Sequence, residues 1–265
     1  MDVKEKEAKL RQFALSILND QEHKQEIDYI LSKLKLSKEK VIQAYIKYDI
    51  DIFAYENEIY ESLDMRAVLY LHNLLKGSWH QERQQDILDM LKNANPKSIV
   101  DMGFGVPTKY IREYILKQRT KLVLVDLYDS AFQFSKILLD YLYSSWKEFI
   151  SFKKLDMNTH EFVGKFDCYI FQDSIEHVKN ATEYLSKTVK FAPKNSKFIL
   201  SLPVGPCVPV HTISWKSNEE VKKWLNGCGL KINKEKEVYV NPKVDLFAEQ
   251  VDKEFYNLIV LCNKE

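Results

Sequence analysis

A glycine-rich turn in residues 98–110 constrains the fold of this chain more than any other stretch. A short β-branched run ends at Asp101, Gly103 and Gly105 follow, and a helical pattern begins after Pro107. The chain has only 7 glycines in 265 residues, so two within three positions need a physical reason. Glycine at a strand-to-helix turn permits a positive φ and lets another group approach the backbone closely. N–H groups of the following helix point into the same space, which is typical of a nucleotide-cofactor turn.

Strand and helix patterns alternate from residue 96 onward. Short apolar runs separated by amphipathic runs imply βαβ units and therefore a parallel sheet. The last two strands have no helix between them, so we expect an α/β sheet closed by an antiparallel hairpin. The predicted strands are 98–101, 121–126, 150–154, 167–171, 197–202, 237–240 and 256–262, and the predicted helices are 108–117, 130–143, 181–191 and 218–226.

Residues 1–95 show only helical periodicity. Ser37 precedes one apolar stripe as an N-cap, and Ser78 has capping-box spacing before a helix over 81–92. Asn93 to Pro96 then ends the helical pattern directly before the glycine turn. We therefore predict an all-helical N-terminal extension over 1–95 and a sheet domain over 96–265.

Composition narrows the class of protein. Hydrophobic residues make up 45% and charged residues 29%, as in ordinary globular proteins, and the net charge of +1 predicts no general binding of polyanions. The charged start does not read as a signal peptide, and no apolar run reaches the roughly 20 residues that span a bilayer. The 4 cysteines are scattered, so we expect reduced thiols, a cytoplasmic location and no structural zinc. The oligomeric state stays open, with a homodimer as one alternative.

Acidic residues stand at the predicted carboxyl ends of four strands. Asp101-Met-Gly-Phe-Gly105 is followed by Asp126, Asp156 and Asp173-Ser-Ile-Glu-His-Val178. With the terminal hairpin, this set resembles class I S-adenosylmethionine-dependent methyltransferases over residues 95–265. The resemblance implies a Rossmann-like fold with S-adenosylmethionine as the cofactor. The chain departs from it at Pro107, where many members carry a third glycine.

The resemblance also implies a cofactor site. Asp126 would bind the ribose, and its distance of about 25 residues from the turn fits an acidic ribose ligand. Gly103 and Gly105 would face the methionine part, Asp156 the adenine amine and Met157 the ring. Asp101, Phe104 and Asp173 complete the predicted cofactor-binding residues. In the alternative interpretation, Asp126 and Asp156 only cap the turns that follow them.

Glu176, His177 and His211 form a second group of candidates, for catalysis. A neutral histidine can take a proton from a hydroxyl or amine as a methyl group transfers. The alternative is a divalent metal on Asp173, Glu176, His177 and His211, because carboxylates and imidazoles are suitable ligands. That arrangement resembles the small-RNA 2′-O-methyltransferases, although Asp173 stands where they have glutamate. A third alternative is that these side chains only make structural hydrogen bonds. Of the two chemical alternatives, we expect the one without a metal.

An aromatic and acidic segment, Phe53 to Met65, lies within the N-terminal extension, which we also call the front end. Tyr55, Tyr60 and Arg66 are its candidate substrate-binding residues, as parts of a lid over the site. The alternative is a helix that simply packs on the sheet domain.

Taken together, the sequence predicts an enzyme that moves a methyl group from S-adenosylmethionine to an oxygen or nitrogen of a small molecule. The expected partner is that acceptor, and neither nucleic acid nor a membrane is expected. Two alternatives stay open: a metal-dependent RNA 2′-O-methyltransferase, and a non-catalytic module that binds the cofactor.

Overall fold

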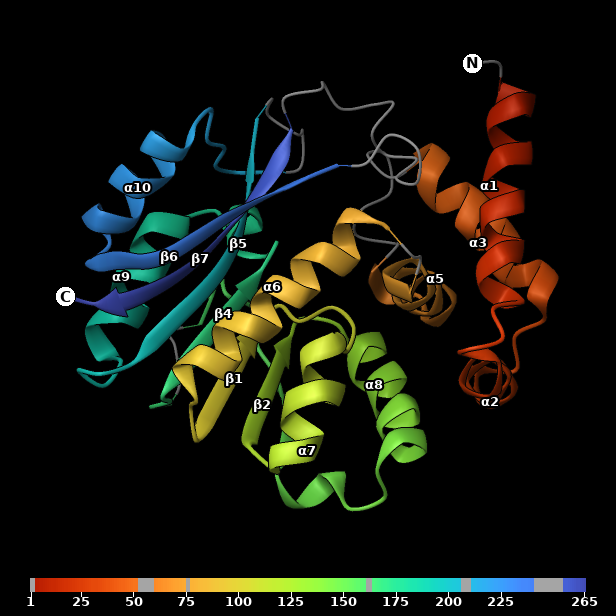
Figure 1. Cartoon of the computed structure of the whole chain (residues 1–265), viewed down its shortest axis with the longest axis horizontal. Coiled ribbons are helices and arrows are strands. Elements are labelled where there is room, and N and C mark those ends of the chain that lie inside the picture. The colour runs from red at the N-terminus through yellow and green to blue at the C-terminus, as the bar shows by residue number, and fades with distance from the viewer. Residues whose placement is uncertain (1–2, 52–59, 75–76, 161–163, 206–210, 241–254) are drawn as a thin grey trace.

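The computed structural model describes residues 3–51, 60–74, 77–160, 164–205, 211–240 and 255–265. These residues form one seven-stranded sheet in the order β3-β2-β1-β4-β5-β7-β6 (Figure 1). Neighbours from β3 to β5 pair in parallel, whereas β7 runs antiparallel to both β5 and β6. The predicted mostly parallel sheet with a terminal hairpin is therefore confirmed. Its strands are β1 (Ser98–Met102), β2 (Lys121–Asp126), β3 (Ile150–Lys154), β4 (Cys168–Gln172), β5 (Lys197–Val204), β6 (Leu230–Tyr239) and β7 (Tyr256–Lys264).

The strand order reverses between β1 and β4. From β1 the chain proceeds to β2 and β3 on one side, and then returns to β4 and β5 on the other. At such a reversal the connections leave the carboxyl ends of neighbouring strands in opposite directions, which opens a crevice for a ligand. The glycine turn follows β1 directly at this position.

Two sets of helices cover the two faces of the sheet (Figure 1). Successive side chains of a strand point to opposite faces of the sheet and so belong to different apolar cores. Ile99 packs with the first set of helices and Val100 with the second. The first set is α6 (Trp79–Ala94), η1 (Ile111–Ile115), α7 (Leu116–Gln118) and α8 (Asp129–Leu142). The second set is α9 (Ala181–Phe191) and α10 (Asn218–Gly227).

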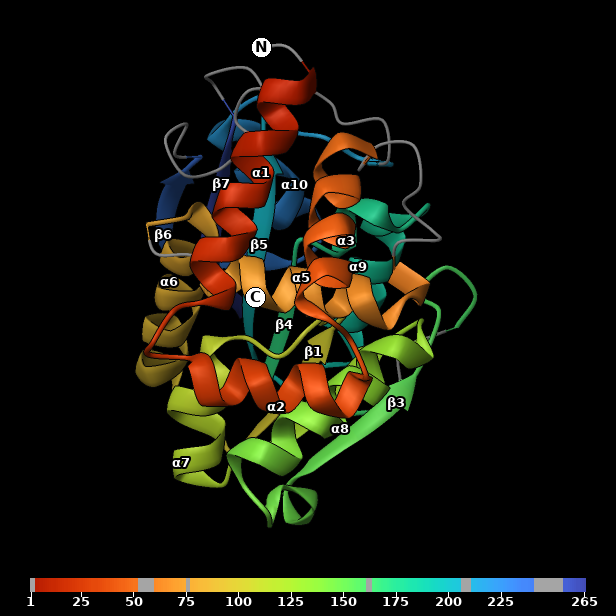
Figure 2. The same cartoon turned by 90° about the vertical axis from the view of Figure 1, so that its right-hand side faces the viewer.

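The remaining front-end helices stack beside the sheet domain, as the view in Figure 2 shows. They are α1 (Val3–Leu18), α2 (Lys24–Leu34), α3 (Lys38–Asp51) and α5 (Leu63–Leu74), and they share an apolar core of their own. A second cluster joins them to the sheet domain, because Ile30 and Tyr70 pack with Val106 and Phe134. Helix α6 packs on the sheet itself through Ile87 and neighbouring apolar residues. The domain boundary at residue 95 stays a prediction.

Two elements differ most from the sequence-based prediction, whereas the limits of the others differ by a few residues at most. The helix expected over 108–117 contains a π-helical turn, Ile111–Ile115. The sequence did not predict this turn, because over five residues an apolar pattern cannot distinguish a π-turn from an α-turn. Strand β6 begins seven residues earlier than expected, at Leu230. Most of its residues from 231 to 237 are exposed and charged, so they carry no alternating apolar signal.

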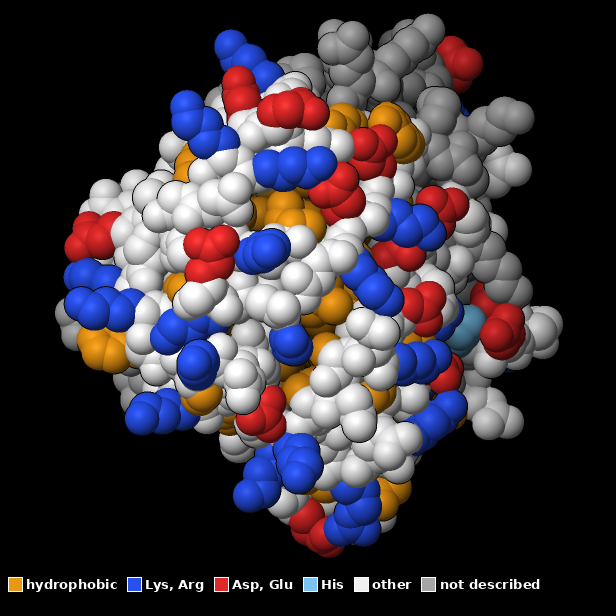
Figure 3. Space-filling view, turned by 60° about the vertical axis from the view of Figure 1, so that its left-hand side comes forward, with side chains coloured by type: hydrophobic (Ala, Val, Ile, Leu, Met, Phe, Trp, Pro, Cys, Tyr) orange, Lys and Arg blue, Asp and Glu red, His pale blue; other side chains and the backbone are white. Residues whose placement is uncertain are grey.

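Surface features agree with the balanced composition. On the face drawn in Figure 3, the described lysine and arginine side chains are interspersed with aspartate and glutamate. Within the described ranges, no helix combines the length and apolarity needed to cross a membrane. The three described cysteines, Cys168, Cys228 and Cys262, are buried free thiols.

Candidate functional site

A cavity of about 540 Å³ lies at the carboxyl ends of β1, β2 and β4. Its wall combines the glycine turn, the segments after β3 and β4, and helices α5 and α6. Twelve predicted site residues line it, namely Tyr60, Arg66, Gly103, Phe104, Gly105, Asp126, Asp156, Met157, Asp173, Glu176, His177 and His211. Asp101 is not among the lining residues, and Tyr55 lies outside the described part of the chain.

The glycine turn exposes bare backbone to this cavity. Gly103 and Gly105 have φ values of +73° and +64°, a region that side chains other than glycine's rarely adopt. A Cβ atom on Gly103 would lie 2.7 Å from the Cβ of Ser174. Ser174 is held there because its Oγ donates a 2.6 Å hydrogen bond to the Met102 carbonyl. Position 103 therefore has no room for a side chain.

Asp101 lies behind the turn, fully buried. Its Oδ2 accepts hydrogen bonds from the Tyr110 hydroxyl at 2.7 Å and from the Gln172 amide at 2.8 Å. Burial raises the pKa of Asp101 to about 7, against the opposing effect of these two hydrogen bonds. Gln172 does line the cavity, so Asp101 can influence a bound group through Gln172.

Asp126 makes the turn-capping contact of the alternative interpretation and also holds the glycine turn. Its Oδ1 accepts a 2.9 Å hydrogen bond from the Tyr128 N–H and so caps the following turn, while Oδ2 accepts one of 3.0 Å from Gly105. A carboxylate offers about four acceptor positions, so capacity for two ribose hydroxyls remains. Burial raises the pKa of Asp126, and the nearby Arg66 guanidinium opposes this.

Arg66 reaches this corner from helix α5 and is only 1% exposed. Its Nη1 donates to the Gly105 carbonyl at 2.9 Å, its Nε to Ser130 Oγ at 3.1 Å, and its Nη2 lies 3.6 Å from Asp126 Oδ1. The guanidinium carbon also lies 5.4 Å and 5.7 Å from the ring centres of Tyr60 and Tyr128. Nη2 is buried and has no hydrogen-bond partner among the described residues.

Asp156 and Met157 follow β3 at another part of the wall. Asp156 Oδ1 accepts a 2.8 Å hydrogen bond from the Asn158 N–H, which is the turn-capping contact of the alternative interpretation. Both residues are half-buried and line the cavity. The Met157 Cε lies 3.5 Å from the position of a Cβ at Gly103, so the thioether borders the glycine turn.

Asp173 ends β4 in an unusual backbone conformation, with φ of +44°. Its Oδ1 accepts hydrogen bonds from Ser201 Oγ at 2.6 Å and from Asn257 Nδ2 at 2.7 Å, and its Oδ2 pairs with Arg83. A non-glycine residue stays in this region when its surroundings determine its position strongly. Asp173 is therefore anchored toward Arg83.

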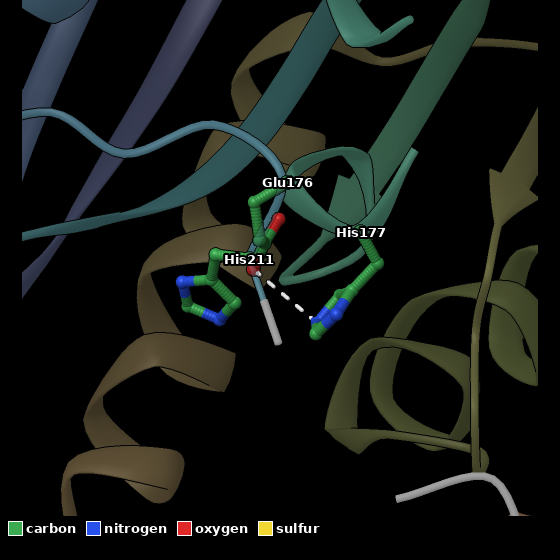
Figure 4. A group of neighbouring side chains, drawn as sticks. All are labelled: Glu176, His177 and His211. Atoms are coloured by element: carbon green, nitrogen blue, oxygen red, sulfur yellow. Dashed lines mark ion pairs between the residues drawn. The ribbon is translucent and has the colours of Figure 1, made fainter. Parts of the chain in front are cut away.

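Glu176, His177 and His211 come together in another part of the wall, and Figure 4 shows their side chains side by side. One ligand atom from each lies within 4.8 Å of the others, and His177 Nε2 is 4.0 Å from Glu176 Oε1. The histidine rings meet edge to face with centres 5.0 Å apart. Burial, and then His177, lower the pKa of His211 to about 4, so this imidazole is neutral at pH 7. Asp173 is not part of this group.

Helix α6 contributes three lining residues that sequence analysis missed: Trp79, His80 and Arg83. Trp79 and Arg83 are four residues apart and share a helical face, and the Arg83 guanidinium carbon lies 4.9 Å from a Trp79 ring centre. The sequence signal that could have identified them is a tryptophan and an arginine four residues apart, on the helix that precedes the glycine turn.

No protein-family model and no curated protein sequence matches the chain. Similar solved structures include a magnesium protoporphyrin IX methyltransferase from Synechocystis with bound S-adenosylhomocysteine, at 12% identity and a TM-score of 0.53 over 83% of this chain and 97% of that one. A second is the 1,6-didemethyltoxoflavin N1-methyltransferase from Burkholderia thailandensis, at 16% identity and a TM-score of 0.50 over 69% and 78%.

A third similar structure is the [4+2]-cyclase SpnF, at 11% identity and a TM-score of 0.54 over 71% of this chain and 83% of the cyclase. The fold therefore hosts more than one reaction, and the chemistry has to be argued from the site. Strand order, terminal hairpin and these similarities together show that the chain has the fold of class I S-adenosylmethionine-dependent methyltransferases.

Proposed function

We propose that this protein transfers a methyl group from S-adenosylmethionine to an oxygen or nitrogen of a small-molecule acceptor. The observation that carries the proposal is one cavity lined by the glycine turn, by Asp126 and by the group of Glu176, His177 and His211. Two of the similar structures are methyltransferases, and one of these is an N1-methyltransferase.

The residues present fit the cofactor. The glycine turn leaves a cradle that a Cβ at Gly103 would fill, and Asp126 keeps free acceptor positions for ribose hydroxyls. The buried Nη2 of Arg66 is a donor in the same corner that a bound group can satisfy. Cavities that hold ligands of this size run from about 300 to 1,000 Å³, which includes the 540 Å³ found here.

When bound, the cofactor supplies a methyl group on a positively charged sulfur. The contribution of this chain is alignment and exclusion of water, which such a displacement chiefly needs. His211, neutral at pH 7, accepts a hydrogen bond from the acceptor's hydroxyl or amine. Glu176 lies close enough to His177 to stabilise an imidazolium there, so His177 is the better proton acceptor of the two.

A metal-dependent reaction is the second candidate, because the ligand atoms of Glu176, His177 and His211 lie within 4.8 Å of one another. A carboxylate with two imidazoles is suitable for a divalent ion. However, Asp173, the fourth residue of the metal hypothesis, pairs with Arg83 instead. A ligand set of three, together with the net charge of only +1, favours the metal-free small-molecule reaction over the RNA reaction.

A screen for release of S-adenosylhomocysteine tests the proposal directly. Purified protein is incubated with S-adenosylmethionine and either fractionated metabolite extracts or small RNAs, with and without a chelator. We expect release with a metabolite fraction and no requirement for metal. Release with RNA alone would favour the metal-dependent alternative, and cofactor binding without release from any acceptor would favour a non-catalytic module.

A further inference from the structure

A second cavity, of about 860 Å³, lies between the helical front end and the sheet domain. Helices α2, α5, α6 and α8 and the segment 107–113 line it, and it takes no part in the proposed reaction. Asn73 and Thr108 also line the candidate site, so both residues stand in the wall between the two cavities. Gly103, Gly105 and Asp126 line only the candidate site. The second cavity is therefore a separate space that adjoins the end of the cofactor turn.

Gln84 in helix α6 presents a buried donor to the second cavity. The residue is only 5% exposed and lines this cavity. Its Oε1 accepts a 2.9 Å hydrogen bond from the Lys109 N–H, which fixes the orientation of the side-chain amide. Nε2 is the other end of that amide, and it is buried without a hydrogen-bond partner among the described residues. A buried donor without a partner is unfavourable, so a ligand that offers an acceptor there stabilises the arrangement.

Two other residues of this wall offer further donors. The Oγ1 of Thr108 is likewise buried, with no partner in the described part of the chain. Arg112 binds Glu26 at 2.8 Å and the Tyr70 hydroxyl at 2.7 Å, and both contacts use its Nη2. Its Nε and Nη1 make no hydrogen bond to the residues that the structure describes, so they are available to a ligand.

The carboxylates of this wall leave less capacity for a ligand. Glu26 is 4% exposed, and its two oxygens lie 2.9 Å and 2.8 Å from Arg112 Nη2. Glu113 pairs at 2.8 Å with the lysine one turn later. Glu22 is exposed, and the exposed cation Lys109 lines the same cavity. Within the described ranges, the buried atoms of this wall that lack a partner are an amide donor and a hydroxyl, and no carboxylate oxygen is among them.

We propose that the second cavity binds a small molecule through an oxyanion, a carboxylate or a phosphate, that accepts hydrogen bonds from Gln84 Nε2, Thr108 Oγ1 and Arg112. An oxyanion presents mainly acceptor oxygens, and its hydrogen bonds to a guanidinium are stronger than those between neutral groups. A neutral polyol brings as many donors as acceptors and gains less from a wall of donors. This site is distinct from the cofactor and acceptor positions and does not depend on the proposed function.

Calorimetry with three small probes at constant ionic strength tests this assignment. Inorganic phosphate and acetate carry the two kinds of oxyanion, and glycerol is the neutral comparison. We expect the wild type to bind phosphate or acetate with a dissociation constant in the millimolar range, and glycerol at least about 10-fold more weakly. The oxyanion that binds more tightly identifies the group on the ligand. Added S-adenosylhomocysteine should leave this affinity within about 2-fold, because the second cavity is separate from the candidate site.

Three variants locate the bound probe. Gln84→Glu keeps the oxygen that holds the Lys109 N–H and replaces the donor by an acceptor, so it should weaken oxyanion binding at least about 10-fold. Thr108→Val removes only the hydroxyl and should weaken binding about 3-fold or more. Gln118→Glu makes the same change of charge at an exposed residue outside the cavity wall and should leave the affinity within about 2-fold.

Thermal unfolding shows whether each variant is folded, and Thr108→Val carries the test alone if Gln84→Glu is not. Wild-type affinity in the two cavity variants would mean that the oxyanion binds elsewhere on the surface, which overturns the inference. Competition by S-adenosylhomocysteine would place the probe in the candidate site and overturn it as well. The inference is also wrong if neither oxyanion binds, or if glycerol binds as tightly as they do.

Discussion

Arg66 in helix α5 donates a 2.9 Å hydrogen bond to the backbone oxygen of Gly105 in the cofactor turn. The same guanidinium lies 3.6 Å from Asp126, the predicted ribose ligand at the end of β2. A residue of the helical front end therefore supports two groups of the candidate site. Arg66 therefore braces the turn and also lines the cavity, while its role toward a substrate stays a prediction.

Loss of this guanidinium should destabilise the protein. Arg66→Met leaves the Asp126 carboxylate buried beside an apolar side chain, and breaking a buried ion pair in this way costs about 3 kcal/mol or more. Urea denaturation should show this drop in the free energy of unfolding. Arg119→Met removes an exposed partner of Glu148 and should cost less than about 1 kcal/mol. Equal small losses in both variants would contradict the role of Arg66 in holding the turn.

Gly103 should tolerate no side chain. At φ of +73°, an alanine Cβ would also lie 2.7 Å from Ser174 Cβ, so Gly103→Ala should cost about 1–3 kcal/mol and abolish measurable cofactor binding. Gly227→Ala is the matched control, because no atom lies within 4 Å of a Cβ there and the glycine ends a helix. Thermal unfolding and calorimetry on both variants measure the difference. A Gly103→Ala protein that binds cofactor normally would disprove the close-approach argument.

Local signals predicted most elements well. Strands β2 and β3 and helix α9 have the predicted limits, because apolar runs and turn residues mark both ends. The predicted caps Ser37 and Ser78 each accept a hydrogen bond from the backbone N–H three residues on. Strand β6 was under-predicted because its exposed charged residues look like a solvated surface. Its position in the sheet depends on pairing with β7, a long-range contact that no local pattern encodes.

Sequence analysis identified the cavity-lining residues that stand at or just after the end of a strand. Asp126, Asp156 and Asp173 gather at one edge because parallel strands end there together. Arg83 was missed, because its role depends on how α6 packs across the sheet. Asp101 was placed in the site by its position in the motif, but its contacts with Tyr110 and Gln172 hold it behind the cavity wall.

Acid–base and metal mechanisms give different responses to a chelator. We expect turnover to survive EDTA, and His177→Asn and His211→Asn each to lower kcat by about 10²-fold or more with little change in cofactor affinity. His160→Asn, an exposed histidine outside the cavity wall, is the control. Loss of activity with EDTA and recovery with Mg²⁺ or Mn²⁺ would instead support the metal site. Full activity of both cavity variants in EDTA would leave alignment alone as the source of catalysis.

The pH profile should not report His211 near neutrality. Its pKa is lowered to about 4 by burial and by His177, so it stays neutral as the pH falls from 7 to 5. An ordinary histidine becomes protonated near pH 6.5, and activity that depends on its neutral form is lost there. We expect no such loss from His211. The measurement is the ratio of wild-type to His211→Asn turnover across this range, which we expect to be constant. A ratio that falls toward 1 near pH 6.5 would show that His211 titrates normally.

His72 should make stability depend on pH. Desolvation by burial lowers its pKa to about 4, and its Nδ1 lies 2.6 Å from the Tyr45 hydroxyl. Between pH 6.5 and 4 the unfolded chain binds the extra proton, so the free energy of unfolding falls as the pH falls. The stability gap between wild type and His72→Gln should therefore narrow from pH 7 to pH 4.5 in urea denaturation. A gap that stays constant would contradict a buried neutral His72.

Calorimetric titration with S-adenosylhomocysteine tests the central claim most directly, because it measures cofactor binding without any knowledge of the acceptor. We predict a dissociation constant in the micromolar range for the wild type and for Asp129→Ala, which alters only an exposed pair with Lys154. Asp126→Ala should weaken binding by about 1–3 kcal/mol through lost ribose hydrogen bonds. No binding by the wild type, or equal affinity of the wild type and Asp126→Ala, would contradict the account.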